Sequence, residues 1–149
     1  MPSIGIFGAN GRMGRALITV ANEQQLNLTA ATVRPGSDLL GVDAGELAGI
    51  GKLGVPLSAT GADSIKQADI WVDFTMPEAM LAHLQLAVTA GKAMVIGVTG
   101  LTDAQYQQVQ QAAKHIPIVW APNMSVGVNL LLHLVQTAAK VMGQTADIE

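Results

Sequence analysis

Three glycines at three-residue spacing, Gly8, Gly11 and Gly14, separate an apolar run that begins at Ile4 from an amphipathic stretch. The apolar residues of that stretch recur at the spacing of a helix. The helix face that we expect to be buried holds Met13, Ala16, Leu17, Val20 and Ala21. A strand, a glycine turn and a helix in this order are the context in which such a triplet predicts dinucleotide binding.

Each glycine has its own physical role in this interpretation. Gly8 can adopt the backbone angles of a sharp turn, Gly11 lets a pyrophosphate approach the main chain, and Gly14 lets the helix pack closely. Unpaired N–H groups and the helix dipole favour an anion at the start of the helix. A tight turn that binds nothing is the alternative, and Arg12 either contacts a phosphate or points into water.

Length and composition exclude several classes of protein. The 149 residues suit one domain, and half of them are hydrophobic while 3% are aromatic, so the core must be mainly aliphatic, as in helices packed on a parallel sheet. A net charge of −3 without a basic stripe argues against a nucleic-acid partner, and the lack of cysteine excludes zinc–thiolate sites. We find no signal peptide or membrane span, and we expect a cytoplasmic protein with no metal site, in which residues 126–142 form a buried helix.

Strand and helix patterns alternate along the chain. Strands are expected at residues 26–33, 55–58, 69–74, 93–96 and 116–121. Helices are expected at residues 63–68, 75–90, 102–114 and 125–142, with an irregular loop at 38–57. Capping boxes at Thr75 and Thr102, and Gly91 after a helix, mark the helix ends. The alternation predicts an α/β fold, a Rossmann-like, doubly wound parallel sheet that forms a dinucleotide-binding domain over residues 1–146.

Right-handed crossovers bring the turns after the strands to one edge of the sheet, where ligands bind in such folds. These turns cover residues 8–14, 34–37, 75–77, 97–100 and 121–125. Asp73 is expected to orient its turn by accepting backbone N–H bonds, and Lys92 to place a favourable charge at a helix end. We expect no catalytic role for the histidines, with His83 and His133 in helices at the surface or the edge of the core and His115 at a helix end.

Four of these turns and the last three residues carry recognisable motifs. They are GANGRMGR (8–15), VDFTMPE (72–78), GKAMVIGVTG (91–100), APNMSVGVN (121–129) and DIE (147–149). In this order they resemble the 4-hydroxy-tetrahydrodipicolinate reductase family over nearly the whole chain. The resemblance implies hydride transfer from NADH or NADPH to a cyclic dicarboxylate in lysine and diaminopimelate biosynthesis. It also implies a second, mixed-sheet domain, absent from this chain, that binds substrate and forms a homotetramer, and residues 147–149 would begin the strand leading into it.

The resemblance also implies which residues form the cofactor site. Those around the pyrophosphate would be Gly8, Ala9, Asn10, Gly11, Arg12 and Met13, and those around the nicotinamide would be Gly97, Val98, Thr99, Ala121, Pro122, Asn123 and Met124. Thr99 would also reach substrate. The family's His-His pair, its lysine and its Ser-Gly-Thr loop would follow residue 149, so we expect no catalytic residue in this chain and no activity from it alone. A freestanding NAD(P)-binding module or sensor, and a structural remnant, stay open as alternatives.

The cofactor preference depends on the end of the second predicted strand. In NAD-selective folds an acidic residue there binds the adenosine ribose and repels a 2′-phosphate. This chain has Val33 at that place, and Arg34 follows in a turn that Pro35 stiffens. Because a guanidinium matches phosphate geometry, the sequence predicts that NADPH is preferred over NADH and that Arg34 contacts it. The alternative is that Arg34 points into water.

Overall fold

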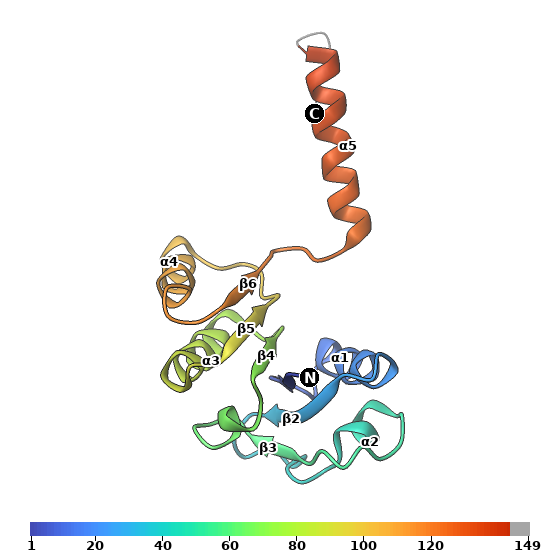
Figure 1. Ribbon diagram of the computed structural model, residues 1–149, viewed down its shortest axis with the longest axis vertical. Helices are drawn as coiled ribbons and strands as arrows, with labels where there is room; N and C mark the ends of the chain where they lie inside the picture. Colours follow the sequence, from blue (N-terminus) through green and yellow to red (C-terminus); the bar gives the residue numbers. More distant parts are fainter. Residues whose placement is uncertain (144–149) are drawn as a thin grey trace.

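Six short apolar segments form one parallel sheet in the computed structural model, which describes residues 1–143. They are β1 (Ser3–Ile6), β2 (Asn27–Val33), β3 (Leu57–Ala59), β4 (Ile70–Asp73), β5 (Ala93–Ile96) and β6 (Ile118–Trp120). Their order across the sheet is β3-β2-β1-β4-β5-β6 (Figure 1). The strand order therefore reverses between β1 and β4, the position at which doubly wound sheets bind ligands. The strand expected at residues 147–149 lies outside the described residues.

Helices cover both faces of this sheet. α1 (Arg12–Glu23) and α2 (Ala44–Ala48) lie on one face, and α3 (Pro77–Ala90) and α4 (Asp103–Ala112) lie on the other (Figure 1). A 3-10 turn, η1 (Ser64–Gln67), precedes β4. The predicted Rossmann-like α/β fold is confirmed, and so is the capping box with which Thr102 and Gln105 begin α4.

An aromatic stack fixes the end of β1 from one side. The indole of Trp71 is fully buried, and its Nε1 donates to the carbonyl oxygen of Ile65 at 3.1 Å. Phe7 stacks on this indole with 4.3 Å between ring centroids. Gly5 makes room for the stack, because a Cβ there would lie 2.7 Å from the indole ring. The glycine turn thus starts from a strand end that is anchored in the core.

The segment predicted to be an irregular loop, residues 38–57, contains the short helix α2 and is ordered by one carboxylate. Asp43 caps α2, and its two oxygens accept backbone N–H bonds from Gly45, Glu46, Leu53, Gly54 and Val55 at 2.7–3.3 Å. The bond from Leu53, together with the others, holds the pKa of Asp43 below its usual value of 3.8. The expected strand at 55–58 begins later, at Leu57.

Two helix starts differ from their predictions. The buried residues of α1 are Gly14, Ile18 and Ala21, whereas Met13 and Val20 are 45% and 48% exposed, because Gly14 packs against the glycine turn and turns Met13 outward. The capping box at Thr75 is not formed. No side chain caps α3, and the Thr75 hydroxyl donates instead to Asp73 at 2.6 Å.

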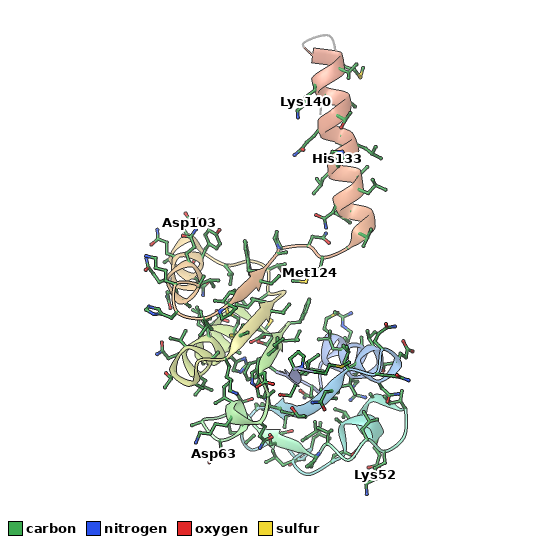
Figure 2. All side chains as sticks on the ribbon, in the orientation of Figure 1. Lys52, Asp63, Asp103, Met124, His133 and Lys140 are labelled. Carbon is green, nitrogen blue, oxygen red and sulfur yellow. The ribbon has the colours of Figure 1, made fainter. Side chains whose placement is uncertain are left out.

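The helix predicted to be buried, α5 (Val126–Met142), contains no buried residue. It projects away from the sheet (Figure 1), and Figure 2 shows His133 and Lys140 on it and Met124 in the segment before it. Ser125 caps the helix as predicted. Leucines such as Leu131, 59% exposed, find no covering surface among residues 1–143. Over these same residues no helix has the length and apolar character of a membrane span.

Candidate functional site

The glycine turn connects β1 to the amino end of α1 and lies at the edge of the sheet where the strands end. Gly8 has a φ of 63°, which glycine adopts without strain, and its carbonyl oxygen accepts the N–H of Gly11 at 2.9 Å. Gly11 is the N-cap of α1, and no side chain caps the helix. The first N–H groups of α1 therefore keep their capacity to bind an anion.

A cavity of about 320 Å³ lies over this turn. Its lining consists of Phe7, Gly8, Asn10, Gly11, Arg12, Met13, Gly14, Phe74 and Thr75. We call it the turn cavity. Five of the six residues predicted to hold a pyrophosphate line it, which leaves only Ala9 outside. Ala9 is fully buried below the turn, and its N–H donates to the carbonyl oxygen of Thr32 at 2.9 Å.

A second cavity, of about 580 Å³, adjoins the first along the edge toward β2 and β3. Its lining consists of Gly8, Asn10, Arg34, Pro35, Thr60, Thr75, Ala79 and His83, and we call it the β2 cavity. Gly8, Asn10 and Thr75 line both cavities, so the two form one continuous site. Arg34, the residue predicted to contact the cofactor beyond the turn, is exposed at the rim of the β2 cavity.

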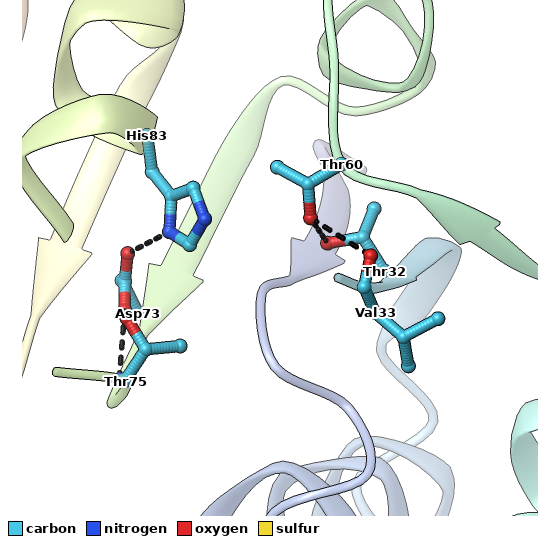
Figure 3. Close-up of polar contacts among 6 residues, drawn as sticks. All are labelled: Thr32, Val33, Thr60, Asp73, Thr75 and His83. Atoms are coloured by element: carbon cyan, nitrogen blue, oxygen red, sulfur yellow. Dashed lines mark hydrogen bonds and ion pairs between the residues drawn. The ribbon is translucent and has the colours of Figure 1, made fainter. Parts of the chain in front are cut away.

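A buried polar cluster forms one wall of the β2 cavity (Figure 3). Asp73 is fully buried, and its Oδ1 accepts both the backbone N–H and the hydroxyl of Thr75, at 2.8 and 2.6 Å. Its Oδ2 lies 2.6 Å from Nδ1 of His83. The predicted role of Asp73 in orienting its turn is confirmed. The interpretation of His83 as a residue in a helix at the surface or the core edge holds for the core edge, because the residue is 9% exposed, stacks on Phe7 and lines the β2 cavity.

The opposite wall of the β2 cavity is formed at the ends of β2 and β3 (Figure 3). The hydroxyl of Thr60 lies 3.0 Å from the hydroxyl of Thr32 and 3.2 Å from the carbonyl oxygen of Val33. Val33, which stands where NAD-selective folds have an acidic residue, is fully buried. Among the residues that the structure describes, no carboxylate lines the β2 cavity, although Asp73 lies behind its wall.

The residues predicted to lie at the nicotinamide are on the same sheet edge but outside both cavities. Residues 97–99 follow β5 and residues 121–124 follow β6. Phe74 connects them to the turn cavity, because it lines that cavity and its ring packs on Gly97. Val98 is buried, whereas Thr99 and Met124 are exposed. The Asn123 side chain accepts the N–H of Ser125 at 2.8 Å and so orders the loop that leads into α5.

Arg15 and Lys92 have structural partners. Arg15 donates to the carbonyl oxygens of Asn10 and Leu47, and so braces the glycine turn against α2. Lys92 lies 3.7 Å from Asp69 at the opposite edge of the sheet, where Ser3 also donates to Asp69 through its N–H and hydroxyl. The donors on Ser3 and the charge of Lys92 lower the pKa of Asp69.

His83 and Thr60 line the site although neither is predicted to do so from the sequence. A signal for His83 exists, since Ala79 and His83 are four residues apart and share the face of α3 that begins at the ligand edge. The sequence carries no such signal for Thr60. The strand before it was expected at residues 55–58 but covers Leu57–Ala59, and the segment before that strand has no clear periodicity.

The chain matches known proteins along almost its whole length. The family profile described as "Dihydrodipicolinate reductase, N-terminus" matches residues 2–124. The 4-hydroxy-tetrahydrodipicolinate reductase of Acinetobacter baumannii is 53% identical over 99% of this chain and 54% of its own length. That of Pseudoalteromonas atlantica is 53% identical over 100% of this chain and 56% of its own length.

A solved structure shows the same likeness. The dipicolinate-bound dihydrodipicolinate reductase from Paenisporosarcina sp. TG-14 is 28% identical, with a TM-score of 0.66, over 93% of this chain and 54% of that one. The chain therefore spans about half the length of the relatives that it matches.

Proposed function

The chain belongs to the dihydrodipicolinate reductase family, and from this premise we propose that it forms the part of such a reductase that binds a reduced nicotinamide dinucleotide. One observation carries the proposal. The uncapped amino end of α1 opens into the turn cavity at the point where the strand order reverses. Helix N–H groups in this position suit a pyrophosphate.

The two halves of the dinucleotide are assigned by the direction in which the site extends. The end of β2 is the place that contacts the adenosine ribose in Rossmann-like folds, so we assign the β2 cavity to the adenosine. The nicotinamide would then lie toward β5 and β6, beside residues 97–99 and 121–124. Arg34 at the rim of the β2 cavity would contact a 2′-phosphate, and we propose that NADPH is preferred over NADH.

We further propose that the whole reductase reduces the compound for which its relatives are named, 4-hydroxy-tetrahydrodipicolinate. The dipicolinate bound to the Paenisporosarcina reductase is a cyclic dicarboxylate of the same class. Thr99 is exposed near the assigned nicotinamide side, where it could contact such a substrate. The cofactor would supply the hydride, and residues 1–143 would hold it and set its orientation. A cytoplasmic location and a homotetramer of the whole protein remain expectations.

Titration calorimetry of this chain with NADPH tests the proposal. We expect one site per chain and competition by NADH. A folded chain that binds neither dinucleotide would contradict the proposal and favour the structural remnant. The freestanding module remains the second candidate, and it differs from the reductase in the DNA beyond codon 149. An open frame there that encodes a His-His-x-x-Lys-like stretch supports the reductase.

A further inference from the structure

We propose that His83 selects adenine as the base of the bound dinucleotide, by accepting a hydrogen bond at Nε2 from the exocyclic amino group of the base. The inference rests on the proposed function, because it assigns the β2 cavity to the adenosine. It adds a base-reading residue to a site that the glycine turn and Arg34 define only through phosphates.

The position of the imidazole is fixed on two sides. One ring face stacks on Phe7, with 4.1 Å between centroids and 10° between the planes. Nδ1 is held at 2.6 Å by Asp73, which is itself fully buried. Figure 3 shows the other ring nitrogen turned toward the space in front of Thr60 and Val33, and His83 and Thr60 both line the β2 cavity. The ring is thus presented to the cavity by its Nε2 edge.

The partners of Asp73 determine which nitrogen of His83 carries the hydrogen. Oδ1 accepts two bonds from Thr75, and Oδ2 is left as an acceptor for Nδ1–H. In a neutral imidazole whose Nδ1 is protonated, Nε2 is an acceptor with a free lone pair. The cavity wall therefore presents an acceptor on a ring that is mostly buried and held in one orientation.

The other polar side chains of the β2 cavity differ from His83 in charge, in position or in being already hydrogen-bonded to neighbouring residues. Arg34 can only donate, and the hydroxyl of Thr75 is engaged by Asp73. Thr60 directs its hydroxyl to Val33 and Thr32. Asn10 lies on the glycine turn, at the end of the cavity assigned to the phosphates. Among the residues that line the β2 cavity, His83 is the one that presents a ring nitrogen to which no described residue is hydrogen-bonded, on a ring held by Asp73 and Phe7.

Adenine and hypoxanthine differ at the atom that this acceptor would read. Adenine carries an amino donor at the purine six-position, whereas hypoxanthine carries a carbonyl oxygen. Opposite Nε2 of His83, adenine makes a hydrogen bond, while hypoxanthine sets two acceptors against each other. A site that binds a donor in this way rejects the analogue without it, because its own polar group is left unpaired.

The test compares NADPH with its deamino analogue, which carries hypoxanthine, in the same buffer. We expect the chain to bind NADPH about tenfold or more tightly than the deamino analogue. His83→Asn retains an N–H donor near Asp73 and removes Nε2, so its ratio of affinities should fall close to one. His115→Asn is the matched control, because His115 is exposed in the segment after α4, and it should keep the ratio of the unmodified chain.

A measurement on the unmodified chain makes the result independent of how the variant folds. The 15N resonance of His83 Nε2 should have the shift of a free lone pair without ligand and should move on adding NADPH, but not on adding the deamino analogue. Equal affinities of the unmodified chain for the two dinucleotides would overturn the assignment of His83 alone. Failure to bind either one would overturn the proposed function and this assignment with it.

Discussion

Gly14 packs so closely on Gly8 that a Cβ on Gly14 would collide with the carbonyl oxygen of Gly8. The first turn of α1 can reach the glycine turn only because this side chain is absent. We expect Gly14→Ala to lower the free energy of unfolding by about 1–3 kcal/mol, the usual cost of overpacking. Urea denaturation measures the change, and an unaltered midpoint would show that the turn and helix can separate without cost.

Gly11 differs from Gly14 in what surrounds it. A Cβ there would lie 3.3 Å from the Gly8 carbonyl oxygen, and the residue has a φ of −71° that valine tolerates. Gly11→Val should therefore remain folded while its branched side chain fills the turn cavity. Because overpacking typically costs about 1–3 kcal/mol, we expect NADPH affinity to fall by up to roughly a hundredfold. Calorimetry decides, with circular dichroism as the folding control. Unchanged affinity would mean that the glycine turn is only structural.

Arg34 should determine the preference between the two cofactors. It is exposed at the rim of the β2 cavity, and no carboxylate from residues 1–143 lines that cavity. A charge-assisted contact with a 2′-phosphate contributes about 1.5–3 kcal/mol, so Arg34→Ala should weaken NADPH about ten- to a hundredfold and leave NADH unchanged. The preference should shrink as salt rises. Equal binding of NADPH and NADH to the unmodified chain at low salt would contradict the assignment.

Asp43 should make the fold sensitive to acid. Its backbone donors lower its pKa in the folded chain, so its contribution is present above the usual value of 3.8 and is lost as the pH falls through the lowered value. Asp43→Asn should unfold at lower urea concentration at pH 7, and the difference from the unmodified chain should shrink below about pH 4. Asp63→Asn is the control, because Asp63 is exposed and pairs only with Lys66 at 3.4 Å. A difference that persists at pH 2 would point to packing instead of charge.

The chain by itself should bind NADPH without oxidising it. Residues 97–99 and 121–124, assigned to the nicotinamide side, contain no His, Asp, Glu, Lys, Tyr or Cys that could act as a general acid toward substrate. We expect no substrate-dependent loss of absorbance at 340 nm when the chain is mixed with NADPH and 4-hydroxy-tetrahydrodipicolinate. Turnover close to that of a full-length relative would show that a proton donor within this chain has been overlooked.

The sequence predicts the order of strands and helices well, because the signals involved are local. The glycine turn, the Thr102 capping box and the Gly91 helix end each depend on a few adjacent residues. The same locality explains the failures. The sequence around Thr75 fits a capping pattern, but the hydroxyl of Thr75 donates to the buried carboxylate of Asp73 and does not cap the helix.

Long-range contacts explain why parts of the candidate site could not be predicted. His83 appears in the sequence as one polar residue in an apolar helix, and only its contacts with Asp73 and Phe7 show that it is buried and ordered. Hydropathy likewise predicts a buried helix at residues 126–142. Apolar side chains allow a helix to be buried, but they do not show that another surface is present to pack against it.

The exposure of α5 has a consequence for how the chain unfolds. A helix of 17 residues with no buried residue gains little from tertiary packing within residues 1–143, so its helicity rests mainly on intrinsic propensity and the Ser125 cap. The helical fraction of such an unpacked segment depends on its length and on temperature. In this chain α5 should therefore follow its own helix–coil equilibrium: its amides should exchange with solvent quickly while those of β1 and β4 stay protected, and heating should melt it gradually, ahead of the cooperative transition of the sheet.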